Sequence, residues 1–172
     1  MKKVAGHVLL LTGLSFVQCA NKNNDAAPVS PIPANTASVK IDGVAFPVNI
    51  SSSQVSIYAN SGELRASLNT ADPLGPFVLL RVAEFRNRAE QIQFTAGSAS
   101  QIVAGAGFKP GAGSDYSTDF CGTRTQAVEI VAFNSTNKTV SVRFSGTACG
   151  GQNSAQQKTI SEGVFNLPYT VR

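Results

Sequence analysis

The side chains that most often carry chemistry are scarce in this sequence. Its 172 residues include a single histidine, His7, and three cysteines, Cys19, Cys121 and Cys149. His7 lies in an N-terminal apolar segment that we expect to be removed, which would leave the rest of the chain without an imidazole. Ser-His-Asp and Cys-His catalysis, histidine-ligated zinc and histidine acid–base catalysis all need that group. We therefore expect the protein not to be an enzyme of these classes.

The residues before Cys19 predict export. Two lysines precede the apolar run VLLLTGLSFV at positions 8–17, which is the pattern of a secretory signal peptide. The run is shorter than the roughly 20 apolar residues that a membrane-spanning helix needs. We therefore predict that this segment is a cleaved leader and not a permanent membrane anchor.

Cys19 stands where a lipidated cysteine would stand. The sequence FVQC at positions 16–19 resembles the lipobox of bacterial lipoproteins, in which the chain is cut just before a cysteine that receives a diacylglyceryl group. We predict a lipoprotein signal peptide at 1–18, an acyl anchor on Cys19 in membrane lipid, and an outer-membrane lipoprotein on the periplasmic or surface face. The alternative is ordinary cleavage before Ala20, which would release a soluble secreted protein.

A proline-punctuated segment follows the cysteine. Residues 19–35 contain Pro28, Pro31 and Pro33 among polar residues. Proline-rich segments are extended and semi-rigid, with a length of about 3.1 Å per residue. We predict that this segment is a tether between the lipid anchor and a folded domain at 36–172.

The other two cysteines are predicted to form a disulfide. Positions 126–144 alternate apolar and polar residues around an NSTN turn, which predicts a β-hairpin. The register that pairs Ile130 with Val140 also places Cys121 opposite Cys149, where Cβ atoms on facing strands lie about 4.5–5.5 Å apart. Once the first cysteine is acylated, these two remain as a pair for an oxidising compartment. The alternative is two buried free thiols.

Carboxylates could still do chemistry, but their spacing selects no pair. A glycosidase needs two carboxylates about 5–10 Å apart across a cleft. Asp115 and Asp119 could also give oxygens to a calcium ion, although no EF-hand pattern is present and calcium prefers six to eight oxygens. The default interpretation of both is turn-forming aspartate, so we expect no metal and no cofactor. The candidates for carboxylate catalysis are Asp72, Glu84, Glu90, Asp115, Asp119, Glu129 and Glu162.

The best candidate for a binding surface is the glycine-rich segment at 105–115, GAGFKPGAGSD. It lacks the Gly-Lys-Ser/Thr of a phosphate loop, and we expect it to be a long loop, a common place for binding residues on β scaffolds. The candidate ligand-binding residues are Phe108 and Lys109 in this segment, together with Tyr58 and Tyr116. The alternative is that both tyrosines simply complete strands.

Charge argues against a nucleic-acid partner. The chain has a formal net charge of +4, of which two charges belong to the lysines of the leader. A charge this small gives little electrostatic attraction to phosphate backbones. Arg81, Arg86 and Arg88 alternate with Glu84 and Glu90, so we expect them to form a solvated face whose charges pair with one another.

Short strand patterns with turn signals between them fill the rest of the chain, and no long helical pattern separates them. Such a series predicts an all-β domain, an antiparallel β-sandwich or, alternatively, an open or partly closed antiparallel β-barrel. One short helical turn is a further possibility at 86–93. The expected strands are 38–48 around the hairpin dipeptide Asp42-Gly43, 54–60, 63–69, 76–83, 92–95, 116–121, the hairpin at 126–144, and 163–171.

Three segments also resemble a family of small lipoproteins of unknown function from Bacteroidota. They are ASVKIDGVAFPV at 37–48, AVEIVAFNSTNKTVSVRFSGTA at 127–148 and KTISEGVFNLPYTV at 158–171. The resemblance implies an all-β domain on a lipid anchor, and it implies no catalytic residues. We therefore expect a non-enzymatic binding or structural module whose partner is an envelope protein or a glycan. The alternatives are a carboxylate-dependent glycan hydrolase and a β-barrel carrier of a small apolar ligand.

Overall fold

The computed structural model describes residues 30–88, 90–94, 104–111, 115–123, 125–151 and 155–172. The predicted signal peptide at 1–18, Cys19 and the first part of the tether, up to residue 29, lie outside these residues. The described part of the chain contains twelve strands and two short 3-10 helices. The strands are β1 (Thr36–Ile41), β2 (Val44–Ala45), β3 (Gln54–Tyr58), β4 (Glu63–Asn69), β5 (Phe77–Val82), β6 (Glu90–Phe94), β7 (Ala104–Lys109), β8 (Tyr116–Ser117), β9 (Gln126–Asn134), β10 (Thr139–Gly150), β11 (Gln157–Pro168) and β12 (Thr170–Val171), and the helices are η1 (Ile50–Ser52) and η2 (Thr118–Phe120).

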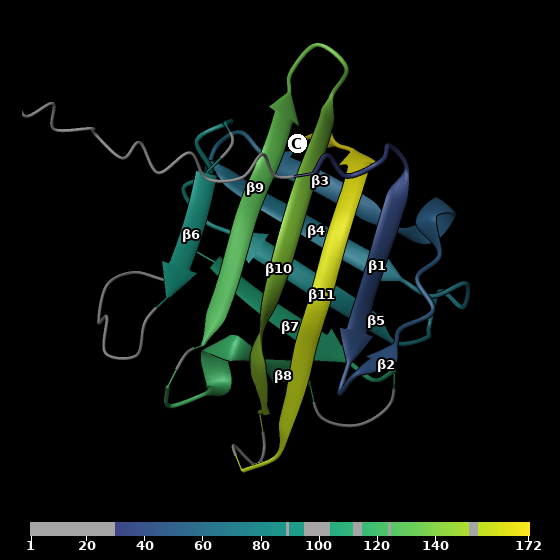
Figure 1. The fold of residues 1–172 in the computed structure, drawn as a ribbon, viewed down its shortest axis with the longest axis vertical. Coiled ribbons are helices and arrows are strands. Elements are labelled where there is room, and N and C mark those ends of the chain that lie inside the picture. The colour runs from purple at the N-terminus through teal and green to yellow at the C-terminus, as the bar shows by residue number, and fades with distance from the viewer. Residues whose placement is uncertain (1–29, 89, 95–103, 112–114, 124, 152–154) are drawn as a thin grey trace, which may run out of the picture.

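The strands lie in two layers that face each other (Figure 1). β6, β9, β10, β11 and β1 form the front layer, and β3, β4, β5, β7 and β8 run across behind it. The layers are joined at one end by the pairing of β8 with β10. At the other end β11 continues through Tyr169 into β12, which pairs in parallel with β3. The all-β prediction is confirmed: one large, mostly antiparallel sheet folds over on itself and, within the described residues, does not close into a barrel.

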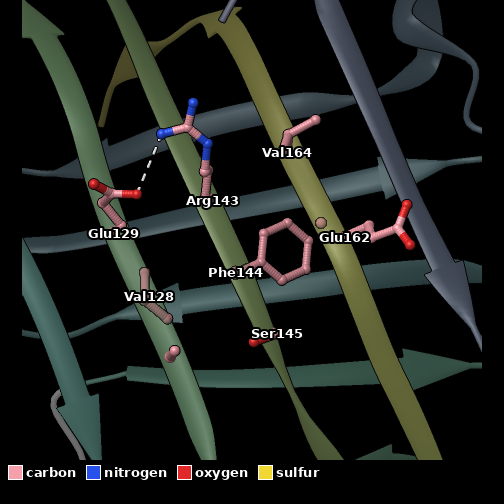
Figure 2. A pocket seen from close by; sticks show the side chains of 9 residues that line it. Val128, Glu129, Arg143, Phe144, Ser145, Glu162 and Val164 are labelled. Carbon is pink, nitrogen blue, oxygen red and sulfur yellow. Dashed lines mark hydrogen bonds and ion pairs between the residues drawn. The ribbon is translucent and has the colours of Figure 1, made fainter. Parts of the chain in front are cut away.

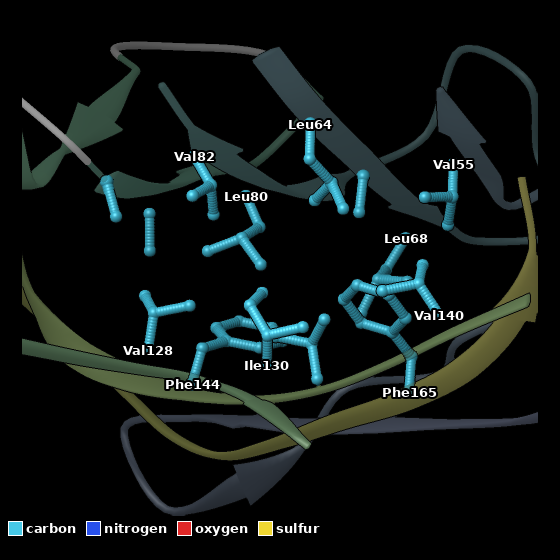
Figure 3. Close-up of a cluster of buried hydrophobic side chains, with 14 of the residues drawn as sticks. Val55, Leu64, Leu68, Leu80, Val82, Val128, Ile130, Val140, Phe144 and Phe165 are labelled. Carbon is cyan, nitrogen blue, oxygen red and sulfur yellow. The ribbon is translucent and has the colours of Figure 1, made fainter. Parts of the chain in front are cut away.

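The core fills the space between the layers (Figure 3). Alternate residues of β4 and β5 point inward, which is the period of two that a half-buried strand requires. Leu64, Leu80 and Val82 from the back layer meet Ile130 and Phe165 from the front layer, and each is at most 1 % exposed. Burying such side chains contributes roughly 1.5–3 kcal/mol each relative to leaving them in water. The apolar contact between the layers therefore holds the folded sheet together.

Most of the predicted strands are confirmed with shifted ends. The bounds of β4 are the predicted ones, 63–69, and the Asp42-Gly43 dipeptide makes the turn between β1 and β2 with φ angles of 51° and 78°. Positive φ at both turn residues is what a two-residue hairpin turn requires. The last predicted strand, 163–171, is divided between the longer β11 and the short β12.

Two local predictions are wrong. Residues 104–109, most of which were assigned to a loop, form β7, which pairs with β5 along its whole length. The possible helical turn at 86–93 is absent, because residues 90–94 form β6 beside β9; the strand predicted at 92–95 is confirmed with an earlier start. In both cases pairing with a neighbouring strand outweighs the weak local preference of the sequence.

The Cys121–Cys149 disulfide is present, but the register from which it was predicted is wrong. Ile130 pairs with Val142 and not with Val140, because the turn occupies residues 135–138, with Asn134 opposite Thr139, and so lies further along the chain than the predicted register requires. A bulge between Ser141 and Val142 then shifts the pairing by one residue. Cys121 follows η2 and lies outside β9, while Cys149 is opposite Ser117 of β8. The bond therefore links η2 to the end of β10, with the two Cα atoms 5.1 Å apart.

The segment that precedes β1 contacts the front layer. The Arg143 guanidinium donates a hydrogen bond of 2.6 Å to the carbonyl of Ser30, and the Asn166 amide donates one of 2.8 Å to the carbonyl of Ile32. The Ile32 side chain is only 9 % exposed. Residues 30–35, predicted as the end of the tether, thus lie against the domain, and residues 20–29 remain between them and Cys19.

Candidate functional site

A groove on the outer face of the back layer gathers most of the predicted binding residues. Its volume is about 270 Å³, and β5, β7, β8 and η2 form its floor and walls. We call it the β7 groove. Its lining includes Phe77, Leu79 and Arg81 of β5, Gly105, Gly107 and Lys109 of β7, and Asp115, Tyr116, Asp119 and Phe120 on the opposite side.

Two outward-facing positions of β7 carry no side chain, which lets residues 116–119 lie close against this strand. Ala104 and Ala106 point into the core and are at most 2 % exposed, so the alternation of the strand turns Gly105 and Gly107 outward. A Cβ atom added at Gly105 would lie 3.5 Å from the Asp119 carboxylate, and one added at Gly107 would lie 2.9 Å from the Tyr116 carbonyl oxygen. The backbone of β7 therefore forms the floor, and residues 115–120 rise beside it.

The wall formed by η2 is fixed from several directions. The backbone N–H of Asp119 donates a hydrogen bond of 3.1 Å to the Ser117 hydroxyl, and the N–H of Ala106 donates one of 3.2 Å to the buried hydroxyl of Thr118. The Cys121–Cys149 disulfide follows directly and ties this wall to β10. Asp119 and Phe120 are thus presented to the groove from a short segment held at both of its ends.

The opposite wall ends at a charged network. Glu63, only 4 % exposed, accepts two hydrogen bonds of 2.8 Å from the Arg65 guanidinium and a further one from Arg81. The Arg65 guanidinium also lies 4.7 Å from the centre of the Tyr58 ring. The hydrogen bonds from Arg65 and then Arg81 hold the pKa of Glu63 below its usual range, although burial raises it. This network fixes the Arg81 side chain at the edge of the β7 groove.

Replacing Glu63 by glutamine is expected to lower the free energy of unfolding by about 1–3 kcal/mol at pH 7, because charge-assisted hydrogen bonds contribute about that much. Since the folded-state pKa lies below the ordinary value of 4.5, this contribution is complete above that pH and is lost as pH falls through the folded-state value. Urea unfolding of wild type and Glu63→Gln at pH 7 and pH 3 should show a difference that narrows in acid.

The matched control for this experiment is Glu162→Gln. Its side chain is 67 % exposed and its carboxylate pairs with Lys40 at 2.7 Å, and exposed pairs of this kind contribute about 0–1 kcal/mol. A Glu63→Gln effect no larger than that of Glu162→Gln at pH 7 would contradict a stabilising role for the network.

Five of the predicted site residues line the β7 groove, Phe108 among them. Lys109, Asp115, Tyr116 and Asp119 all line it, and the Lys109 ammonium lies 3.5 Å from the Asp115 carboxylate. The Lys158 side chain also lies over the Tyr116 ring, with its ammonium 6.0 Å from the ring centre. Residues from the predicted loop at 105–115 and from the predicted strand at 116–121 thus line the same groove in the structure.

The other two predicted aromatic residues have different surroundings. Phe108 reaches the rim of the β7 groove, but its ring packs at the edge of the core, 6.0 Å from the ring of Phe46 and 6.3 Å from that of Tyr116. Tyr58 lies beyond the groove, against Arg65. Neither is an open platform for a ligand.

A second depression, of about 300 Å³, lies on the front layer among β9, β10 and β11 (Figure 2). Glu129 of β9 turns toward Arg143 of β10, with 3.3 Å between carboxylate and guanidinium, whereas Glu162 of β11 points away toward β1 and pairs with Lys40. Two of the predicted catalytic candidates therefore border one depression, and each has a cationic partner.

Of the remaining carboxylate candidates, Asp72 and Glu84 do not line the β7 groove. The Asp72 carboxylate accepts a hydrogen bond of 2.9 Å from the N–H of Leu74, and Glu84 has a positive φ of 54° in the chain after β5. The side chain of Glu90 lies outside the described residues. Within the described ranges, no three His, Cys, Asp or Glu side chains gather where they could hold a metal ion. No helix in these ranges is long and apolar enough to cross a membrane.

Sequence reasoning missed the residues that shape the groove. Gly105 and Gly107 were assigned to a loop, and Arg81 was expected to pair with glutamates near it in sequence, whereas its partner is Glu63 on the neighbouring strand. A signal for β7 was available, because small outward glycines alternate with Ala104, Ala106 and Phe108. Comparison with known proteins adds no further candidate: no family model, no curated protein and no solved structure matches this chain.

Proposed function

We propose that the protein is an exported envelope lipoprotein, anchored through an acylated Cys19, whose β domain binds a partner molecule in the β7 groove and performs no catalysis. The observation that carries the proposal is the groove itself. The backbone of Gly105 and Gly107 lines it together with charged and aromatic side chains from β5, β7 and residues 115–120. A concave site with a few convergent polar groups is the usual form of a small-molecule site.

The rest of the chain supports a binding role over catalysis. No histidine follows His7, and of the charged residues in the β7 groove, Lys109 and Asp115 pair with each other while Arg81 is held by Glu63. Such side chains are suited to hold and orient a ligand. The resemblance to Bacteroidota lipoproteins, in which no catalytic residues are established, points in the same direction.

The anchor and the domain would be separated by a short spacer. Because residues 30–35 lie against the front layer, only residues 20–29 remain free to span the distance from Cys19. At about 3.3–3.6 Å per residue for a fully extended chain, these ten residues reach at most roughly 35 Å. The domain would therefore work close to the membrane that holds its lipid.

Metabolic labelling with a radioactive fatty acid tests the anchor. We expect the wild-type protein to take up label and to sediment with membranes, and we expect Cys19→Ala to lose both properties, because a cysteine thiol is the site of acylation. The Cys121→Ser/Cys149→Ser variant, which lacks the disulfide and keeps Cys19, is run in parallel and should still be labelled. An unlabelled wild-type protein would show that the protein is secreted without a lipid.

Nuclear magnetic resonance tests the groove. A library of small sugars, amino acids and nucleosides is added to the isotope-labelled full chain, and the backbone amide signals of Gly105 and Gly107 are followed. We expect members of one chemical class to shift these signals and those of Asp119 together. If no compound shifts them, the groove is not a binding site.

A further inference from the structure

We infer that the β7 groove binds a saccharide, taking up one or two sugar rings of a neutral glycan. This inference rests on the proposed function and adds the chemical class of the ligand. It is carried by three properties of the groove: an aromatic platform at Phe120, a balance of charge among the polar residues, and a small volume.

The Phe120 ring is supported from behind and open in front. A Cβ atom added at Gly151 would lie 2.9 Å from Cε2 of Phe120, so the ring rests on the bare backbone of that glycine. The Phe120 side chain nevertheless remains among the exposed large hydrophobic residues, with 47 % of the residue accessible. A ring that is held by backbone and still exposed is a rigid surface of low entropic cost, on which the C–H face of a sugar ring can stack.

The polar residues of the groove are balanced in sign. Two cations, Arg81 and Lys109, face two carboxylates, Asp115 and Asp119. A strongly charged ligand would meet a repelling group as well as an attracting one, which disfavours phosphates and polycations. Sugar hydroxyls both donate and accept hydrogen bonds, so they can use the carboxylates as acceptors and the guanidinium as a donor.

The position of Arg81 is fixed before any ligand arrives. Its hydrogen bond to Glu63, on the neighbouring strand, orients the guanidinium at the groove wall. Pre-ordered donors lose less conformational freedom when a ligand binds. The volume of about 270 Å³ is at the lower end of small-molecule sites, which suits a short stretch of a longer glycan.

The test is titration calorimetry of the full chain, kept in a detergent without a sugar headgroup, with a panel of maltose, cellobiose, xylobiose, mannobiose and N,N'-diacetylchitobiose and their longer oligomers. We expect at least one series to bind. Phe120→Ala should weaken that binding about 3- to 10-fold, the range expected for a lost stacking contact.

Leu74→Ala is the matched control, because it truncates an apolar side chain that is 87 % exposed and outside the groove. It should leave saccharide affinity unchanged. Binding that is equally strong in Phe120→Ala would overturn the inference. If no saccharide binds while amino acids or nucleosides shift the groove signals, the ligand class is wrong and the proposed function stands; if nothing shifts them, both fail. Cleavage of a bound oligosaccharide, followed by chromatography, would contradict the non-enzymatic proposal alone.

Discussion

Replacing Cys121 and Cys149 together by serine is expected to lower the free energy of unfolding by about 3–4 kcal/mol. The two cysteines are 28 positions apart. In the chain-entropy model, a cross-link closing about 15 residues contributes roughly 3 kcal/mol and one closing about 100 residues roughly 4.7 kcal/mol. The closed loop contains β9 and most of β10, so without the bond the unfolded chain gains freedom over a large part of the front layer.

Urea unfolding of wild type and of the Cys121→Ser/Cys149→Ser variant, monitored by circular dichroism, measures this difference. Both proteins should carry Cys19→Ser, so that no other thiol can pair. Wild type unfolded in the presence of a reductant should match the variant. A variant that loses less than about 1 kcal/mol would show that the unfolded chain is held together by other contacts, or that the bond strains the folded state.

The same variant distinguishes an effect of the disulfide on stability from an effect on the shape of the β7 groove. The Thr118 hydroxyl still accepts a hydrogen bond from Ala106, and Ser117 still holds the N–H of Asp119. Within the folded population, η2 should therefore keep its place on β7. The disulfide then stabilises the domain as a whole. Its loss should lower the fraction of folded protein and leave the shape of the β7 groove in the folded molecules unchanged.

The sequence was sufficient to predict the fold class and most of the strands, because those depend on local patterns. β4 alternates apolar and polar residues without interruption, and Asp42-Gly43 is a strong hairpin signal. The register of the β9–β10 hairpin could not be predicted in the same way. The alignment depends on the turn at 135–138 and on a one-residue bulge between Ser141 and Val142. Neither feature is reported by the pattern within one strand.

The strand β7 illustrates a second limit. Glycine is depleted in strands because it loses more backbone entropy than other residues and offers no side chain to pack, so GAGFK favours a loop on local grounds. In the structure β7 is held by β5 along its length, and Ala104 and Ala106 complete the core. The residues that make the strand improbable by propensity are the ones that make the groove.

The candidate site was predictable in its parts but not in its geometry. Lys109, Tyr116, Asp115 and Asp119 were chosen for their chemistry, and all line the β7 groove. Arg81 was assigned to a self-paired run because sequence neighbours were considered first. Its real partner, Glu63, is adjacent only through the antiparallel pairing of β4 with β5. Contacts across strands depend on register, and register is the least local feature of a sheet.

Gly163→Ala is expected to destabilise the domain by about 1–3 kcal/mol, the range for overpacking a filled core. Gly163 lies opposite Phe144 in the β10–β11 pair, directly after a bulge in β11. A Cβ atom at this position would lie 2.7 Å from Cε1 and Cζ of the Phe144 ring and 2.7 Å from its carbonyl oxygen. The ring is buried against Phe165, so the ring and the backbone of β10 would both have to move.

The matched control is Gly122→Ala, since a Cβ atom there has no heavy atom within 4 Å. Alanine also restricts the unfolded chain, so this substitution should be neutral or stabilise by up to about 1 kcal/mol. Chemical denaturation of wild type and both variants measures the free energy of unfolding. The same change, glycine to alanine, is thereby compared at a tightly packed position, Gly163, and at an open one, Gly122. If Gly163→Ala proves as stable as Gly122→Ala, Phe144 must have room to turn away from β11, and the core between the layers would be looser at that point than the contacts of Gly163 indicate. If the expected difference appears, Gly163 is required because a residue without a side chain lets the Phe144 ring lie this close to β11. The close contact packs the front layer against the core next to the bulge in β11.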